Sequence, residues 1–244
     1  MWSFLCSWFG YCIHENVILK SYKGPLRYSQ DHTPTIHVIN VAGKHGELRR
    51  KNIVRTTGSY PYEFVAAHVP TIPIQQNKKC INEGVLTQGN MALVRSHSSL
   101  YERLLKSEEP WMLIAEDDIE LVSNFKIQIA AVTKKLPKHF DVIKLEYCNK
   151  EPIVSRVAAI YERQGGPCTA LYIVSREGAQ LLLDINPPSM PCLNADGILD
   201  PFNHPAVYSG HRLIRIFHTV PPLGWQNKEK RIRNSGGQHA SSCF

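Results

Sequence analysis

The chain has 244 residues, of which 43% are hydrophobic and 20% are charged. This composition is ordinary for a globular protein and excludes a protein that lacks a hydrophobic core. One sizeable globular domain is therefore expected. The 28 lysine and arginine residues outnumber the 21 acidic ones, so the formal net charge is +7, which favours anionic partners such as nucleotides and phosphates. A nucleic-acid-binding protein is not favoured, because the basic residues lack interleaved aromatic residues and any recognisable module.

The first 13 residues are apolar and rich in aromatic side chains, and a polar stretch follows them. A membrane-spanning helix needs roughly 17 to 25 residues, and a signal peptide begins with basic residues, so the segment fits neither. Peripheral membrane contact through the N-terminus and packing on the domain are both open. We treat residues 1–32 as an apolar extension that precedes the domain.

The domain is predicted to begin near residue 33, because Pro34 precedes a run at 35–40 that is typical of a buried strand. A basic loop then opens a helix, and Gly43 and Gly46 give its backbone freedom. A loop of this kind after a strand suits phosphate binding, although its spacing matches neither the P-loop nor the dinucleotide-binding motif. An ordinary solvated helix start is the alternative.

Strand-like and helix-like patterns alternate along the rest of the chain. Leucines recur at helical spacing in the segment from Thr87 to Pro110. The remaining predicted elements are strands at 111–115, 140–147 and 168–175 and helices at 123–137 and 176–185. This alternation predicts an α/β domain over residues 33–226, whose mixed, mainly parallel sheet is flanked by helices. Residues 227–244 are interpreted as a basic C-terminal tail.

Three consecutive acids, Glu116, Asp117 and Asp118, follow the predicted strand at 111–115. Adjacent carboxylates repel one another, so water or a cation must compensate them. Ligands gather at the carboxyl ends of strands in an open α/β sheet, and strand alternation makes Glu116 and Asp118 point the same way. Two such carboxylates suit Mn²⁺ or Mg²⁺ together with substrate phosphates. The alternative is that the acids cap the next helix or pair with arginines.

The seven cysteines contain no CxxC pair and are spread over a chain too long to need a disulfide framework. We therefore expect mostly reduced thiols, with Cys148, Cys168 and Cys192 as structural thiols. A cytoplasmic location is expected for the same reason, with membrane association through the N-terminus as the open addition.

A series of short stretches resembles glycosyltransferase family 25, the lipopolysaccharide and procollagen-galactosyltransferase group. In chain order they are IHVIN, LTQGNMALVRSHSSLYERLL, LIAEDDIELVSNF, FDVIKLEY, GPCTALYIVSREGAQLLL and NADGIL. The resemblance implies a GT-A-type nucleotide-diphospho-sugar transferase fold. It also implies inverting transfer of a hexose, galactose or glucose, from a UDP-sugar to a hydroxyl of a glycan, lipid-linked or protein acceptor, with Mn²⁺ or Mg²⁺ as cofactor.

The same resemblance implies roles for the acids and for one late histidine. Asp118 would bind the metal, and Glu116 would share it or hold the ribose of the donor. In GT-A enzymes generally a C-terminal histidine completes the metal shell, and His218 is the candidate here. The alternative for a lone histidine on an apolar strand is a core residue with satisfied hydrogen bonds.

Further residues are implied around the donor and the acceptor. Those that would lie near the uridine, the phosphates or the donor are Asn40, Arg49, Arg50, Ser96 and His97. Asp196 matches an acidic residue of the family and is the predicted catalytic base. Asp200 and Glu146 are its rivals, and a helix N-cap is the alternative role for Asp196.

The chain departs from the family pattern just before Ser96 and His97. Where the family commonly has Gly-Glu-x-Gly-Cys, this chain has Gly89 followed by NMAL. The missing glutamate and glycine motivate a second hypothesis, a catalytically decayed GT-A-like domain that acts as a binding or scaffold protein.

Overall fold

The computed structural model describes residues 33–147, 157–162, 165–166 and 168–226. The predicted N-terminal extension at 1–32, with its membrane contact, and the predicted tail at 227–244 therefore lie outside the described residues, as does Cys148.

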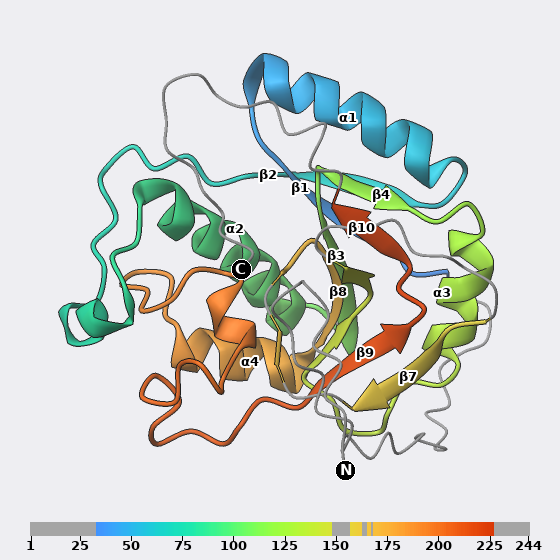
Figure 1. Ribbon diagram of the computed structural model, residues 1–244. Helices are drawn as coiled ribbons and strands as arrows, with labels where there is room; N and C mark the ends of the chain where they lie inside the picture. The colour runs from blue at the N-terminus through green and yellow to red at the C-terminus, as the bar shows by residue number, and fades with distance from the viewer. Residues whose placement is uncertain (1–32, 148–156, 163–164, 167, 227–244) are drawn as a thin grey trace, which may run out of the picture.

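A seven-stranded sheet forms the centre of the domain, with the strand order β2-β1-β3-β8-β5-β9-β7 (Figure 1). Its strands are β1 (Ile36–Asn40), β2 (Tyr62–Ala66), β3 (Trp111–Glu116), β5 (Val142–Lys144), β7 (Ala159–Glu162), β8 (Leu171–Ser175) and β9 (Ile216–Val220). Within the described ranges, β7 and β8 run antiparallel to the other strands of this sheet, which share one direction. The prediction of a mixed, mainly parallel sheet is confirmed.

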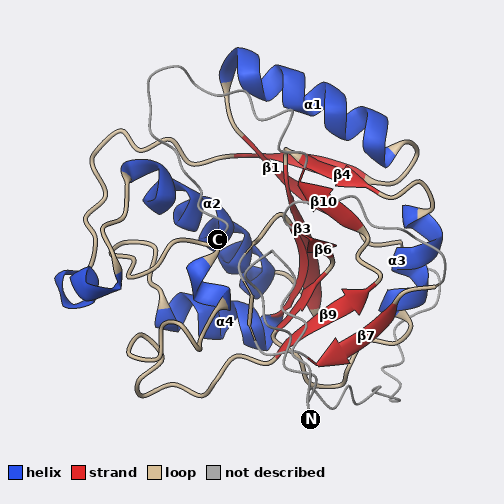
Figure 2. Cartoon of the chain, viewed as in Figure 1, coloured by secondary structure: helices blue, strands red, loops and turns tan. Residues whose placement is uncertain are grey.

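Helices cover both faces of the sheet (Figure 2). One face packs against α1 (Gly43–Thr57) and α3 (Phe125–Thr133), and the other packs against α2 (Gln88–Lys106) and α4 (Arg176–Ile185). Alternate residues of β3 enter the two cores, Leu113 on one side and Ile114 on the other. Because both faces are buried, β3 has a continuous apolar sequence, which is why the sequence pattern located it.

Two of the helices, α2 and α4, begin at residues whose side chains cap the first turn. Thr87 and Asn90 form a reciprocal capping box at the start of α2, with two 3.1 Å contacts between the side chain of each and the backbone N–H of the other. Asn90, which departs from the family pattern, thus stabilises a helix end. Ser175 caps α4 by accepting from the Gly178 N–H at 2.9 Å, and α4 spans the predicted residues 176–185.

A second, small sheet of order β4-β10-β6 lies beside the large one. Its strands are β4 (Ile119–Leu121), β6 (Glu146–Tyr147) and β10 (Gly224–Gln226). The single strand predicted at 140–147 is therefore wrong in one respect, since the chain leaves the large sheet at Leu145 and enters the small one. Leu145 donates its N–H to the Leu171 carbonyl at 3.0 Å and accepts from the Leu223 N–H at 2.6 Å, which fixes the crossing point.

A disulfide joins Cys80, in the 3₁₀ helix η1 (Lys78–Glu83), to Cys192 in the segment after α4. Cys168 is also disulfide-bonded. The expectation of structural thiols is therefore wrong for Cys168 and Cys192. The pair Cys80–Cys192 is separated by 112 residues, and no local spacing pattern marks such a pair.

Within the described ranges, no helix combines the length and the apolar character that a membrane span requires.

Candidate active site

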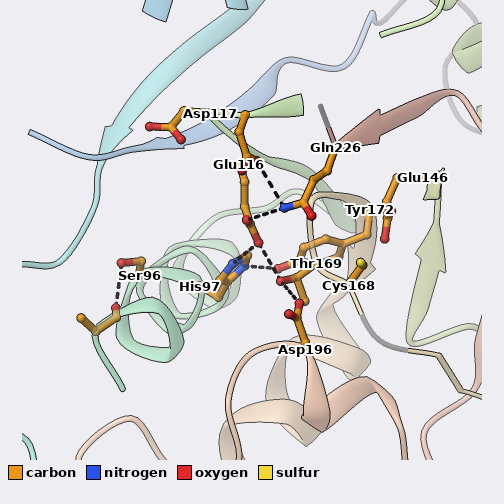
Figure 3. A network of polar contacts seen from close by, with 12 residues as sticks. Ser96, His97, Glu116, Asp117, Glu146, Cys168, Thr169, Tyr172, Asp196 and Gln226 are labelled. Carbon is orange, nitrogen blue, oxygen red and sulfur yellow. Dashed lines mark hydrogen bonds and ion pairs between the residues drawn. The ribbon is translucent and has the colours of Figure 1, made fainter. Parts of the chain in front are cut away.

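The acidic triplet stands at the end of β3, and a network of polar side chains gathers around it (Figure 3). Glu116 and Asp118 face the same partner, because Nε2 of Gln226 lies 3.4 Å from Glu116 Oε2 and 3.3 Å from Asp118 Oδ1. The middle acid, Asp117, points away from this cluster (Figure 3). The structure thus brings together the pair of acids that strand alternation predicted.

Asp117 ties the end of β3 to the loop after β1. Its Oδ2 accepts from Asn40 Nδ2 at 2.8 Å and from the Val41 N–H at 3.0 Å, while its Oδ1 accepts from Arg49 Nη1 at 2.7 Å. Asp117 is buried, so these contacts offset the cost of burying its charge. Pairing with an arginine was the alternative role for the acids, and Asp117 has it, since it pairs with Arg49 and positions Asn40 as well.

The loop after β1 is held close to the first turn of α1. A Cβ atom on Gly46 would lie 1.7 Å from the Val41 carbonyl oxygen, so only glycine fits there. Arg50 donates its Nε–H to Asn40 Oδ1 at 2.5 Å, and its guanidinium lies 4.7 Å from the centre of the Phe64 ring. The predicted donor-binding residues Asn40, Arg49 and Arg50 therefore form one connected group beside the acids.

His97 reaches the acids from α2. Its Nε2 lies 3.5 Å from Glu116 Oε1, its Nδ1 lies 2.7 Å from the Tyr172 hydroxyl, and that hydroxyl lies 2.8 Å from the hydroxyl of Tyr101. A carboxylate only accepts, so a hydrogen on Nε2 faces Glu116, and Nδ1 accepts from the Tyr172 hydroxyl. Burial raises the pKa of both tyrosines, which keeps them as neutral donors.

Ser96 lies next to His97 in sequence but faces another segment. Its hydroxyl donates to the Ala92 carbonyl at 2.8 Å and accepts from the His68 N–H, after β2, at 2.9 Å. Successive residues of a helix point about 100° apart, so the pair cannot serve one ligand atom together. His97 therefore joins the acid cluster, whereas Ser96 fixes the chain after β2.

Thr169 connects Glu116 to Asp196 and was not predicted. Its Oγ1 lies 2.8 Å from Glu116 Oε1 and 3.0 Å from Asp196 Oδ1. Thr169 precedes β8, and because β8 is antiparallel to β3, the beginning of β8 shares the edge at which β3 ends. The sequence contained no signal for this position, since the direction of β8 was unknown.

The two acids that Thr169 contacts have pKa values shifted in opposite directions. Burial and the charge of Glu116 raise the pKa of Asp196. Burial also opposes the charge on Glu116, but the contact with His97, the hydroxyl of Thr169 and the charge of Arg49 outweigh it and lower the pKa of Glu116. Thr169 carries one hydroxyl hydrogen, so it can donate to only one of the two acids at a time.

Asp196 stands at the N-cap position of the 3₁₀ helix η2 (Gly197–Leu199), but its side chain makes no capping hydrogen bond. The structure therefore does not support the capping alternative. Its rival Asp200 accepts from Asn203 Nδ2 at 2.7 Å in a turn. Of the two, Asp196 is the acid that the structure joins to the cluster.

Glu146, the other rival, lies deeper, beside Lys144 at the end of β5. Lys144 Nζ lies 3.5 Å from Glu146 Oε1 and donates to the carbonyls of Gly166 at 2.7 Å and Cys168 at 2.6 Å. Both side chains are buried, and burial raises the pKa of Glu146 to about 7 even though the charge of Lys144 lowers it. The pair is therefore shielded from an incoming acceptor.

His218 lies on β9, in register with Lys144. Its Nε2 is 3.2 Å from the Gly165 carbonyl oxygen. Across the described part of the chain, no three histidine, cysteine, aspartate or glutamate side chains are grouped to hold a metal ion. The structure therefore does not bring His218 into such a group with Glu116 and Asp118.

The two acids alone nevertheless have the chemistry of a divalent-cation site. One oxygen of each acid lies 3.3 to 3.4 Å from the same Gln226 nitrogen, so a cation at that point would face both carboxylates. Hard oxygen ligands of this kind suit Mn²⁺ or Mg²⁺, which take their remaining ligands from water and phosphate. The residues present fit the predicted metal, with Glu116 and Asp118 as the acids that would hold it.

Among solved structures, one that is similar to this chain is the crystal structure of a glycosyltransferase involved in the glycosylation of the major capsid of PBCV-1. The TM-score is 0.34 at 9% identity, and the match covers 62% of this chain and 65% of that chain, so this chain spans less than two thirds of it. The curated proteins contain no match.

The sequence matches a family model over residues 33–198, a region that includes the acids, Thr169 and Asp196. The model describes glycosyltransferase family 25, an LPS biosynthesis protein family. The match covers more than half of the chain and confirms the resemblance that the sequence stretches indicated. The chain therefore belongs to glycosyltransferase family 25.

Proposed function

We propose that this protein transfers a hexose, galactose or glucose, from a UDP-sugar to an acceptor hydroxyl, with inversion and with dependence on Mn²⁺ or Mg²⁺. The observation that carries the proposal is the convergence of Glu116 and Asp118 on one point at the end of β3, beside Asp196. The family membership supports the reaction class.

The donor would lie along the edge formed by the ends of β1 and β3. Arg49 and Arg50 supply positive charge there, which suits a diphosphate. A divalent cation, when bound by Glu116 and Asp118, would neutralise the diphosphate and stabilise it as the leaving group. Asp117 contributes by holding Asn40 and Arg49 in place.

Asp196 is the base in this proposal. As the acceptor oxygen bonds to the anomeric carbon, its proton passes to Asp196, and the bond from that carbon to the diphosphate breaks with its electron pair on the diphosphate. Asp196 is partly exposed, whereas Glu146 is fully buried and paired with Lys144, so an acceptor can reach Asp196 more readily. The acceptor would be a hydroxyl of a glycan, a lipid-linked sugar or a protein.

The disulfide Cys80–Cys192 bears on where the reaction takes place. Disulfides persist in oxidising compartments and are rare in the cytosol. We therefore propose an oxidising compartment in place of the cytoplasmic location expected from the cysteine pattern.

A labelled-donor assay tests the function directly. The full chain is incubated with UDP-galactose or UDP-glucose, with Mn²⁺, Mg²⁺ or a chelator, and with a panel of glycan acceptors. Metal-dependent transfer or hydrolysis of one donor is the expected result. A folded chain that neither binds UDP nor consumes either donor would refute the proposal.

The scaffold hypothesis predicts a different outcome of the same assay. It predicts UDP binding that does not depend on metal, with no turnover. Its motivation was the departure at Asn90, and that residue forms the capping box of α2. His97, further along the same helix, still reaches Glu116.

A further inference from the structure

Gln226 ends β10 and is buried against the acid pair. The antiparallel pairing of β10 with β4 places Gln226 opposite Ile119, the residue that follows Asp118. Its side chain therefore meets both acids from a strand that begins more than 100 residues after them in sequence. No local sequence pattern had indicated a role for Gln226.

The amide of Gln226 occupies the point on which the two acids converge. Its –NH₂ group carries two hydrogens, so it can donate one to Glu116 Oε2 and one to Asp118 Oδ1, at 3.4 and 3.3 Å. Both contacts are long for hydrogen bonds to carboxylates, which usually measure about 2.7–2.9 Å. The amide thus offsets the repulsion between the acids only weakly.

A cation shared by the acids would meet this amide. Mn²⁺ and Mg²⁺ accept an amide carbonyl oxygen as a ligand but not an amide N–H. The terminal torsion of glutamine is broad and roughly two-fold, so a half-turn of the amide exchanges Nε2 for Oε1 with little movement of the chain. The same side chain can therefore contact the acids through Nε2 when no cation is bound and contact the cation through Oε1 when one is bound.

We propose that Gln226 is the third protein ligand of the divalent cation, and that its amide turns from bridging Glu116 and Asp118 through Nε2 to binding the cation through Oε1. The inference rests on the proposed function, because it requires a cation at these two acids. It assigns to Gln226 the place in the metal shell that the sequence reasoning gave to His218.

Metal binding by three variants of the full chain tests the inference. Mn²⁺ affinity is measured by calorimetry and by the electron paramagnetic resonance of free Mn²⁺. In Gln226→Leu the affinity falls about tenfold, because a ligand is lost. In Gln226→Glu, which keeps the shape, the affinity rises by a similar factor and the Tm without metal falls, because a third carboxylate joins the pair.

Gln128 provides the matched control. It is also a buried glutamine, on α3, and accepts from the Ala158 N–H at 2.7 Å. Gln128→Leu should lower the Tm but leave the Mn²⁺ affinity unchanged. If Gln226→Leu binds Mn²⁺ as the wild type does, or if Gln128→Leu weakens binding equally, the inference is overturned.

The donor assay separates this inference from the proposed function. A wild type that binds Mn²⁺ but consumes no donor contradicts the function, while the variants still decide the role of Gln226. A wild type that consumes donor with Mn²⁺ and loses no affinity in Gln226→Leu contradicts the inference alone. A wild type that binds no Mn²⁺ overturns both the inference and the metal dependence.

Discussion

A single buried acid and a pair of acids lie at opposite ends of the parallel strands of the large sheet, and their charges are neutralised in different ways. Asp141, just before β5, is fully buried, and its oxygens accept from the guanidinium groups of Arg212 and Arg215 at 2.6 to 3.3 Å. Glu116, the last residue of β3, and Asp118, in the turn after it, both contact the uncharged amide of Gln226, at 3.3 to 3.4 Å.

The difference separates a structural acid from one that is available to a ligand. Two arginines satisfy the charge of Asp141 within the protein, so nothing further is gained by binding a cation there. The pair at β3 meets the neutral amide of Gln226 at longer distances, and Arg49, whose charge acts on both acids, is itself paired with Asp117, so a divalent cation adds favourable electrostatic energy there. The following predictions test this contrast, from the largest expected effect to the smallest.

Asp118→Asn should reduce UDP-sugar turnover by about a thousandfold, because the charge stabilisation supplied by a bound cation contributes several kcal/mol. The Tm should stay level or rise, since the substitution removes repulsion from Glu116. Turnover is measured with labelled donor and Mn²⁺. The control is Asp184→Asn, at an exposed acid of α4 that pairs with Gln180. Equal turnover by the two variants would exclude Asp118 from the site.

Asp141→Asn should lower the free energy of unfolding by about 3 kcal/mol, because breaking a buried ion pair leaves its partners uncompensated. Urea unfolding followed by circular dichroism measures the change. The Mn²⁺ affinity of the folded variant should equal that of the wild type. A loss of under about 1 kcal/mol would place Asp141 with the ion pairs of the exposed surface.

The stabilisation by Asp141 should also depend on pH. Burial opposes its charge, but the hydrogen bonds from Arg212 and Arg215 outweigh this and lower the pKa of Asp141. The contribution is therefore complete above the unfolded pKa of about 3.9 and is lost as the pH falls through the lower folded pKa. The difference in unfolding free energy between wild type and Asp141→Asn should shrink below about pH 4. A difference that stays constant would contradict the assigned charge state.

Tyr172→Phe should reduce turnover about tenfold and lower the free energy of unfolding by about 1 kcal/mol, because His97 Nδ1 loses its donor. The ¹⁵N chemical shifts of His97 should report a changed tautomer, which a purely structural effect would not produce. Tyr60→Phe, at a buried tyrosine packed on Phe125, is the control. Unchanged shifts in Tyr172→Phe would refute the positioning role.

Local patterns were sufficient for much of the fold. The helix predicted at 176–185 is α4, which Ser175 caps and whose buried residues Ala179, Leu182 and Ile185 recur at a spacing of three. The strand β3 was found because burial on both faces gives it an apolar run. Glu116 and Asp118 were expected to point the same way, and both contact Gln226, although Asp118 lies in the turn after β3. These features depend only on residues that are near one another in sequence.

The remainder depends on tertiary contacts that no local pattern encodes. Thr169 entered the site because β8 runs antiparallel to β3. Gln226 entered it because the three-residue strand β10 pairs with β4, and such a short strand has too few residues for a periodic signal. The break at Leu145 and the pair Cys80–Cys192 likewise follow from packing between distant segments.

The disulfide Cys80–Cys192 lies on the side of the proposed base and not on the side of the acid pair that would bind the metal. It ties the segment before Asp196 to η1, where His204 also pairs with Glu83 at 2.7 Å, while Glu116 and Asp118 follow directly from the central strand β3. Gentle reduction should therefore loosen the proposed base and leave the acid pair in place. We expect the reduced chain to bind Mn²⁺ at full affinity and to consume donor slowly. The state of the disulfide would then affect activation of the acceptor hydroxyl without affecting binding of the metal and the donor.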